Sequence, residues 1–512
     1  MPVRAGAMLL VTLLLGVPGT VSAQCSDGSA PPCARHDAPQ PRSVAVLYFE
    51  NLSHDTTDAM LAEGFSEELM VELGKVEPLR VATRGQVLRL RGRTPDPVIV
   101  GRALSVAYIV SGTIRRSGQR LVVTAELAST NGTGQRVWGE VFDRSSGDLL
   151  DVQSSVARAA ATAIAGRLGP ADRAILARRS TSNAVAWEHY LRGTALLARR
   201  TIDDNLAHAV YELDGAVQLD PTFASAWARL AEALLLVPSY PRDNAQLNPD
   251  SLLAQGARAA DRALALDSAS GAAWMAHGIA LDLRDRQWWD ALRAYRRAVT
   301  LDSTDAETQY HYGTALRHRT TNQVEAERHL RLAHTLDPTL LNAVEWLARL
   351  MRDQGRVFEA GALLDSIAAD SQAAGWGGAW QHHLGADIDL RRGDTAAARR
   401  TTARIVSEVA GRDSLRTLAY AAELTARLGD VTGARALLAR ATTADGNLDR
   451  RVAVASAEVA LGDYDRAIGD LEAVASEGSD LWDNMRQATF DPLRGNPRFA
   501  RLLEKVWPRV SL

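Results

Sequence analysis

The sequence predicts an α+β amino-terminal domain, a mixed sheet with helices, followed by an all-α superhelical solenoid of two-helix repeats. Strand-length apolar runs precede residue 143, Ala and Leu recur at helical spacing from Ala184 onward, and one short motif returns about every 35 residues. The chain has 512 residues, of which 46% are hydrophobic, so at least two domains are expected. A net charge of −3 gives no sign of a nucleic-acid partner or of a polybasic membrane patch.

The first residues have the pattern of a secretory signal peptide. Arg4 precedes an apolar run from Met8 to Val17, and small residues lead to a cleavage site at Ala23. The run is about half of the ~20 residues that span a bilayer. We therefore expect a signal peptide over 1–23 and a periplasmic or otherwise exported mature chain without an integral membrane span. Lipoprotein anchoring at Cys25 is the less favoured alternative, because Gln24 stands where a small residue is needed.

Residues 24–42 are rich in Pro and read as a flexible tether. The tether contains the two cysteines of the chain, Cys25 and Cys33, and export favours a small local disulfide between them. A zinc site that includes His36 is the weaker interpretation, since two thiols without histidines at ligand spacing make a poor zinc site.

The first folded domain is expected over residues 43–168. A continuous apolar run, Val44–Phe49, predicts a buried strand, and a polar loop through Asn51 and His54 follows it. Helical spacing from Met60 to Leu73 then predicts a helix that packs on this strand. The pattern continues with a short strand at Leu79–Ala82 and a short helix near 99–104.

Three alternating segments then predict an antiparallel meander: Tyr108–Ile114, Leu121–Leu127 and Arg136–Phe142. Ser117-Gly118 and the run Asn131–Gly134 supply residues that tolerate positive φ where the meander reverses. In the middle segment Leu121, Val123, Ala125 and Leu127 share one face, which fixes the register. A helix over 149–168 is expected to close the domain.

Several strings in this domain resemble one family in the right order. SVAVLYFENLS, AEGFSEELMVEL, YIVSGTIRRSGQRLVVTAEL and VWGEVFDR are similar to the TolB amino-terminal-like domain, which is related to the FlgO-type domain. The resemblance implies an α/β module without known catalytic residues, often placed before tetratricopeptide repeats. In related proteins the module follows a cyclase, a kinase or a winged-helix regulator, whereas a signal peptide stands there in this sequence.

The repeat region shows two registers. The fragments LDP and LDS place Asp220, Asp267, Asp302 and Asp337 at separations of 47, 35 and 35 residues. A period near 34 residues is typical of tetratricopeptide repeats (TPR), each of which is a helical hairpin. The longer first interval is explained by a Pro- and Asn-rich insertion over 237–251.

In the second register, four glycines each precede an alanine by five residues: Gly355 and Ala360, Gly393 and Ala398, Gly429 and Ala434, Gly462 and Ala467. Glycine permits the tight turn, and alanine permits close approach of the helices. About eight hairpins are therefore expected over 184–479, with a capping segment over 480–512. Trp227 and Trp274 occupy positions that favour a core role over ligand stacking.

No catalytic motif is present: the sequence has no phosphate-binding loop, no nucleophile elbow and no metalloprotease helix. His382 and His383 are adjacent on a predicted helix and point about 100° apart, so they are poorly placed to share a metal. His311 and His318 share a helical face, but no further ligand joins them at suitable spacing. We therefore expect no enzyme activity, no cofactor and no metal.

These observations favour an exported scaffold that binds proteins or peptides in a TPR groove and through the TolB-like domain. Residues on the first helix of each hairpin would make the contacts, and the candidates are Arg229, Gln309, Tyr310 and Arg317. The alternative is a regulatory component that acts in trans on a cyclase, a kinase or a transcriptional regulator.

Overall fold

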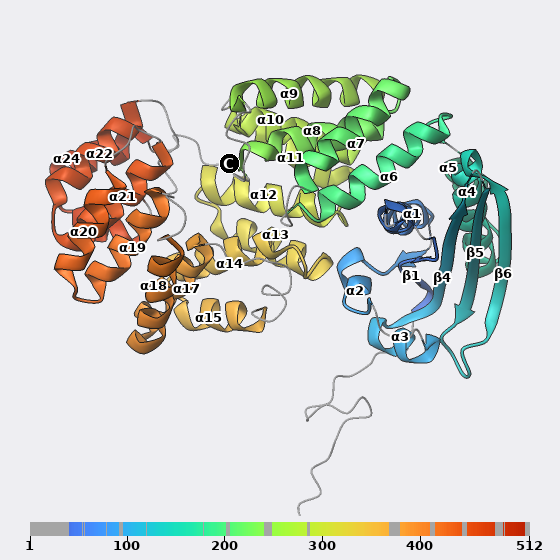
Figure 1. Cartoon of the computed structure of the whole chain (residues 1–512), viewed down its shortest axis with the longest axis horizontal. Helices are drawn as coiled ribbons and strands as arrows, with labels where there is room; N and C mark the ends of the chain where they lie inside the picture. Colours follow the sequence, from blue (N-terminus) through green and yellow to red (C-terminus); the bar gives the residue numbers. More distant parts are fainter. Residues whose placement is uncertain are drawn as a thin grey trace, which may run out of the picture.

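The computed structural model covers the chain from the first strand to the last helix (Figure 1). It describes residues 40–53, 55, 57–77, 79–91, 96–118, 120–177, 179–200, 205–239, 248–283, 287–367, 379–409, 415–442, 448–476, 485 and 487–506. The predicted signal peptide, Cys25 and Cys33 lie outside the described residues.

The amino-terminal domain is built on a six-stranded mixed sheet. Its strands are β1 (Gln40–Val46), β2 (Glu50–Asn51), β3 (Arg80–Val81), β4 (Val106–Ser117), β5 (Arg120–Ser129) and β6 (Arg136–Ser145). The order is β3-β1-β4-β5-β6, with β2 beside β4. β1 runs parallel to β3 and β4, whereas β4, β5 and β6 form the predicted antiparallel meander.

Five helices accompany this sheet among the described residues. They are α1 (Thr57–Gly74), α2 (Arg84–Leu88), α3 (Pro97–Leu104), α4 (Leu149–Ala165) and α5 (Pro170–Ala177). The predicted inward face of β5 is confirmed, because Leu121, Val123, Ala125 and Leu127 are all buried. The turn prediction is also confirmed, since Gly118, Gly132 and Gly134 have positive φ.

Some boundaries differ from the expectation. β1 begins at Gln40, inside the segment expected to be a tether, and ends at Val46, because its pairing with β4 already starts at Gln40 and Val106. β2 lies where a loop was expected, and the five-residue helix α2 was not predicted. The closing helix ends at Ala165, since Gly166 adopts φ 80° and breaks the helix before residue 168.

The rest of the described chain is helical, so the predicted fold class is confirmed. The described helices pair as eight hairpins. They are α6 (Ala184–Ala198) with α7 (Asn205–Leu219), α8 (Ala224–Leu236) with α9 (Pro249–Leu266), α10 (Gly271–Leu283) with α11 (Trp288–Leu301), α12 (Ala306–Arg319) with α13 (Gln323–Leu336), α14 (Leu341–Asp353) with α15 (Val357–Ser366), α17 (Ala379–Arg392) with α18 (Thr395–Val409), α19 (Leu415–Arg427) with α20 (Val431–Ala441), and α21 (Leu448–Leu461) with α22 (Tyr464–Ser476).

The glycine and alanine register has the expected physical basis. Gly355, Gly393, Gly429 and Gly462 all have φ between 78° and 93°, which an L side chain rarely adopts. Their partner alanines are fully buried where two helices meet. The insertion is shorter than expected: a 3₁₀ turn, η2 (Val237–Ser239), follows α8, and α9 already begins at Pro249.

The last described elements pack against the final hairpin. They are η3 (Ala488–Leu493) and α24 (Pro497–Val506). Phe490, Phe499 and Leu502 are buried in one cluster with Ile468 and Leu471 of α22. These residues cover the apolar face that the last hairpin would otherwise expose.

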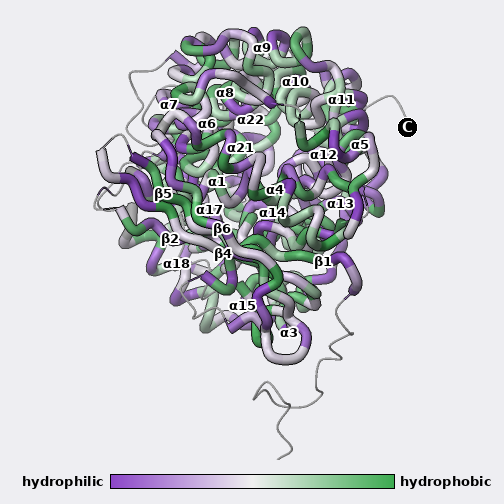
Figure 2. Tube along the Cα trace, turned by 90° about the vertical axis from the view of Figure 1, so that its right-hand side faces the viewer, coloured by the Kyte–Doolittle hydropathy of each residue, from purple (hydrophilic) through white to green (hydrophobic). Residues whose placement is uncertain are grey.

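One hydrophobic core crosses the boundary between the sheet domain and the array. The cluster runs from Val44 and Phe65 through Ala161 and Leu176 to Trp187 and Leu213. Figure 2 views the molecule from the sheet side, with β4, β5 and β6 in front of the array. The first hairpins and the sheet domain therefore form one packed body.

Candidate functional site

The four candidate groove residues lie on α8 and α12, but they differ in exposure. Gln309 and Arg317 are buried. The Gln309 amide donates to the carbonyl oxygen of Ser303 at 2.8 Å, and Arg317 donates to Asp353 at 2.7 Å. This corrects the expectation that these two side chains face a partner, because their polar ends are used inside the array. Arg229 and Tyr310 are partly exposed, and their role as partner contacts stays a prediction.

Arg229 belongs to a group of charged residues that joins the first, second and fourth hairpins. We call Arg200, Arg229, Glu232, Glu307 and His311 the proximal cluster. Arg229 donates to Glu232 at 2.8 Å. Arg200, at the end of α6, forms two hydrogen bonds of 2.8 and 3.0 Å with Glu307 of α12. Ion pairing thus connects the first helices of the first and fourth hairpins at this point.

Burial shapes the titration of this cluster. It raises the pKa of Glu232 and lowers the pKa of His311 to about 4. Burial also disfavours the Glu307 carboxylate, but Arg200 outweighs that effect and holds the pKa of Glu307 below its usual value. His311 is therefore neutral near pH 7, and Glu307 is ionised.

A second network runs along the later hairpins. Arg317, Asp353, Arg352, Asp387, Arg427, Glu423 and His383 form what we call the ion-pair ladder. Arg352 donates to Asp387 at 3.1 Å, and Arg427 donates to the other oxygen of Asp387 at 2.7 Å. The ladder links α12, α14, α17 and α19 in alternating charge, and Thr489 of η3 extends it with a hydrogen bond to Glu423.

Ion pairing outweighs burial in the ladder. Burial raises the pKa of Asp387, but Arg352 and Arg427 hold it well below the usual range. The same holds for Glu423, where the pairing partners are His383 and Arg427. His383 is therefore a structural partner of Glu423, at 3.0 Å, and stacks on Tyr420.

Glu345, on α14 beside the ladder, behaves differently. Burial raises its pKa to about 7, although Arg349 donates to it at 2.9 Å. A buried acid of this kind changes its charge near neutral pH.

Among the described residues, three ion pairs attach the sheet domain to the array, and one of them joins Arg116 of β4 to Glu188 of α6 at 2.9 Å. Arg199 donates to Glu63 of α1 at 2.5 Å. Arg84 of α2 contacts Glu67 at 2.6 Å and Asp337, at the end of α13, at 3.0 Å. Helices α1 and α2 therefore reach both the first and the fourth hairpin.

Glycines allow this contact to be close. A Cβ added at Gly64 would lie 2.3 Å from the carbonyl oxygen of Leu191, and one added at Gly85 would lie 2.5 Å from Asp337. The backbones of α1 and α6 meet at Gly64, so any side chain there would separate them.

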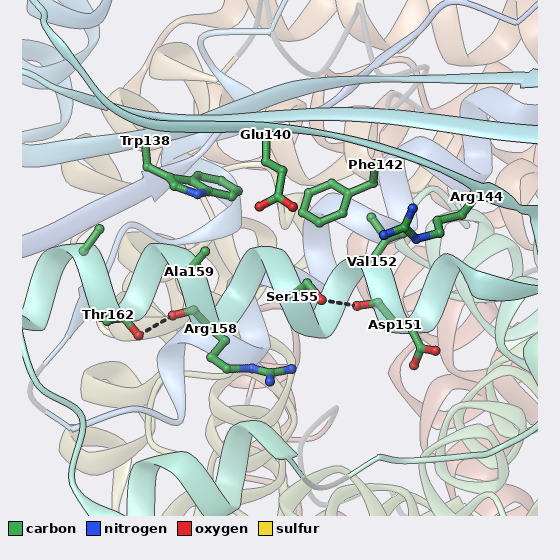
Figure 3. A pocket seen from close by; sticks show the side chains of 11 residues that line it. Trp138, Glu140, Phe142, Arg144, Asp151, Val152, Ser155, Arg158, Ala159 and Thr162 are labelled. Atoms are coloured by element: carbon green, nitrogen blue, oxygen red, sulfur yellow. Dashed lines mark hydrogen bonds between the residues drawn. The ribbon is translucent and has the colours of Figure 1, made fainter.

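An open cleft of about 750 Å³ lies between β6 and α4 (Figure 3). Trp138, Glu140 and Phe142 point from the strand toward α4, and Asp151 and Arg158 come from the helix. The lining thus combines two aromatic rings with charges of both signs.

The described residues contain no group of three or more His, Cys, Asp or Glu that could hold a metal ion. Within the same part of the chain, no helix is long and apolar enough to cross a membrane. His311 and His318 do not share a ligand: His311 lies beside Tyr295 and Glu307, while His318 packs edge-on against Trp346. Trp227 and Trp274 are half-buried, and each indole N–H donates to a turn carbonyl.

No family model matches the sequence. A protein of Rhizobium meliloti (strain 1021) named "Putative adenylate cyclase 3" is 30% identical over 194 residues, which are 38% of this chain. The chain spans about a third of that relative, 32% of its length.

Three solved structures illustrate the similarity in fold. Pseudomonas aeruginosa pilF is 18% identical, with a TM-score of 0.33, and the match covers 44% of this chain and 93% of that one. Yeast Tom70 is 16% identical, with a TM-score of 0.35 and coverages of 62% and 67%. The Cut9–Hcn1 complex gives 11% identity, a TM-score of 0.40 and coverages of 88% and 84%. Scores this low carry no functional conclusion.

The ion-pair ladder was not predicted from the sequence. A usable signal was present, because three inner helices place an acid four residues before an arginine: Glu345 and Arg349, Asp387 and Arg391, Glu423 and Arg427. The contacts between hairpins had no such signal, since their partners lie 35 to 40 residues apart.

Proposed function

We propose that this chain is an exported, non-catalytic scaffold that binds other proteins through the outer edge of its helical array. The observation that carries the proposal is a row of exposed apolar side chains at the starts of second helices. Val324 is 81% exposed and Phe358 is 71% exposed, at the same position of neighbouring hairpins. Val431 and Tyr464, the first residues of α20 and α22, are 50% and 42% exposed. Exposed apolar side chains gathered along one side of a protein are a mark of interaction sites.

The inner side of the array is a weaker candidate for the contact surface. The proximal cluster and the ion-pair ladder use many of its charged groups internally, and breaking such pairs is costly. Docking at the edge leaves both networks intact. A partner with an apolar helix or strand would fit the row.

The test compares affinity capture by three forms of the full chain: the wild type, the double variant Val324→Ser/Phe358→Ser, and Tyr211→Ser. Tyr211 is a matched control, because it is 72% exposed on α7 and lies outside the row. The double variant should lose its partners at an unchanged melting temperature, while the control keeps them. Retention of the same partners by the double variant would sink the proposal.

The TolB-like identity of the first domain and the export of the chain belong to the same proposal, on the motifs and the amino-terminal pattern given above. Recovery of the protein from a periplasmic extract with Gln24 as its first residue would support export. Recovery only from the cytoplasm, with residues 1–23 still attached, would contradict it.

A second candidate function is regulation of a signalling enzyme in trans. The similarity to part of the rhizobial relative favours this candidate, because that protein's name gives it cyclase activity. Addition of the purified chain to the cyclase should change its rate of cyclic AMP formation, whereas the chain alone should form none. An unchanged rate would remove this candidate, and product formed by the chain alone would overturn the non-catalytic assignment.

A further inference from the structure

Strand β6 is a free edge of the sheet. The strand order ends at β6, and among the described residues no strand pairs with its other side. The strand is ten residues long and mostly exposed. Figure 1 places it at the margin of the molecule away from the array. Such an edge presents unpaired N–H and C=O groups that can bond to another strand.

The side chains of β6 alternate between two faces. Trp138, Glu140, Phe142 and Arg144 lie opposite buried residues of β5 and line the cleft beside α4. Val141 points to the other face and is 63% exposed. Apolar side chains of β6 are therefore accessible on both faces of the strand.

The charge pattern of β6 is complementary to itself. In an antiparallel pair of two β6 strands centred on Phe142, Glu140 of each copy lies opposite Arg144 of the other. The two Phe142 rings then face each other across the two-fold axis. Cross-strand neighbours of this kind attract when their charges are opposite.

Centring the pair on Trp138 would also oppose Arg136 and Glu140, but β6 is irregular between Arg136 and Trp138, where its pairing with β5 shifts register. The remaining registers lack the match. Centring the pair on Glu140 places two glutamates opposite each other, and centring it on Arg144 does the same with two arginines. Centring it on Asp143 opposes two aspartates, while centring on Val141 forms no ion pair. Since like charges directly opposite are destabilising and the irregular segment at Arg136–Trp138 pairs poorly, the register centred on Phe142 is favoured.

Helix α4 fits the same symmetry. Figure 3 shows Phe142 above the stretch of α4 between Asp151 and Arg158. A two-fold axis through Phe142 would bring two α4 helices alongside each other in opposite directions. The Asp151 and Arg158 side chains point away from β6, and Asp151 is paired with Arg179, so α4 adds no charge pair to this contact.

We propose that a second copy of this chain pairs with the first through antiparallel β6 strands centred on Phe142, so that the two sheets become one continuous sheet. The proposal does not depend on the scaffold function. It assigns the cleft between β6 and α4 to the dimer contact and leaves the edge of the array free.

The test is sedimentation equilibrium of the full chain. The wild type should dimerise. Each charge reversal, Glu140→Arg or Arg144→Glu, should raise the dissociation constant of the dimer about tenfold or more, because it turns two attractive pairs into two repulsive ones. The double variant Glu140→Arg/Arg144→Glu should restore dimerisation, since the pairs are exchanged. Asp465→Arg is the matched control, because the Asp465 side chain on α22 is 91% exposed, and it should dimerise like the wild type.

A wild type that stays monomeric at high micromolar concentration, or a double variant that is not rescued, overturns the proposal. A second measurement checks the register in a background without Cys25 and Cys33. Oxidation should link Phe142→Cys chains into dimers but should not link Val141→Cys chains, whose thiols lie opposite Asp143. Efficient linking of the Val141→Cys variant alone would overturn the centring on Phe142.

Discussion

Arg84 donates from Nη1 to Oδ2 of Asp337 at 3.0 Å and thereby joins two residues that are 253 positions apart in the chain. The same guanidinium holds Glu67, so one arginine connects α1, α2 and the end of α13. Its side chain is largely buried, where a lost partner leaves a carboxylate without compensation. Arg84 therefore contributes to the docking of the sheet domain on the array, together with the shared hydrophobic core.

Replacement of Arg84 by Met should lower the free energy of unfolding by about 2–3 kcal/mol, because Glu67 and Asp337 would lose their charged partner. Arg494→Met is the control, since the pair of Arg494 with Asp491 is exposed and should contribute less than about 1 kcal/mol. Urea unfolding of both variants measures the difference. Equal losses of unfolding free energy in the two variants would show that the Arg84 bridge stabilises the fold no more than an exposed ion pair.

A methyl group at Gly64 should force α1 away from α6. We expect Gly64→Ala to cost at least about 2 kcal/mol through overpacking against the Leu191 carbonyl. Gly74→Ala, at the end of the same helix, meets no heavy atom within 4 Å and should be neutral or stabilising by up to about 1 kcal/mol. Thermal unfolding of the two variants separates these outcomes, and a neutral Gly64→Ala would contradict the close crossing.

Loss of the Asp387 charge should destabilise the ladder. Asp387→Asn leaves Arg352 and Arg427 facing each other, and we expect a loss of about 3–5 kcal/mol at pH 7. Burial opposes the charge of Asp387, but the arginines outweigh it and depress the pKa, so its contribution is complete above the ordinary pKa of about 4. As the pH falls below that value, the contribution is lost.

The gap between the wild type and Asp387→Asn should therefore shrink in urea titrations at pH 7, 5 and 3. Asp389→Asn is the control on the same helix, because burial raises the pKa of Asp389. The difference in unfolding free energy between the wild type and Asp389→Asn should not shrink between pH 7 and pH 3. A difference that stays constant for Asp387→Asn would contradict the lowered pKa of Asp387.

The contribution of Glu345 to stability should change with pH in the opposite direction to that of Asp387. Burial raises its pKa to about 7 in the folded chain, above its value in the unfolded chain, so the folded state binds the extra proton. Its contribution is present at low pH and falls as the pH rises from about 4.5 to 7, by about 3 kcal/mol. Glu345→Gln should remove this part of the slope and be more stable than the wild type at pH 8.

The comparison with Glu345→Gln must allow for Glu458, whose pKa burial raises to about 8. That residue remains in both proteins, so its slope cancels in the difference. An identical pH dependence of the wild type and Glu345→Gln would contradict the raised pKa of Glu345.

Local sequence patterns predicted the parts of this fold that local chemistry controls. The positive φ at Gly355 and Gly393 and the alternation along β5 follow from single residues and their neighbours. The same reasoning misplaced Gln309 and Arg317, because the position of a residue on a first helix does not tell whether its polar end finds a partner inside.

Long-range pairing could not be predicted. Nothing in the sequence near Arg84 points to Asp337, and Gly64 has no local signal for its contact with Leu191. The self-complementary pattern of β6 was readable in principle, but it gains meaning only when the strand is known to lie at an edge.

The hydrophobic core that passes from Leu176 to Trp187 and Leu213 also defines which piece of this chain could be inherited as a unit. A gene fusion that carried away only the sheet domain would leave α1 without α6 and expose Gly64 and Glu68, which meet Leu191 and Tyr190. A fusion that began with the first hairpin would expose Trp187 and Tyr190. The same core continues to Phe223, Leu230 and Val237. The segment that recombination can move intact therefore runs from β1 through the second hairpin, and new effectors or further repeats are best joined outside it.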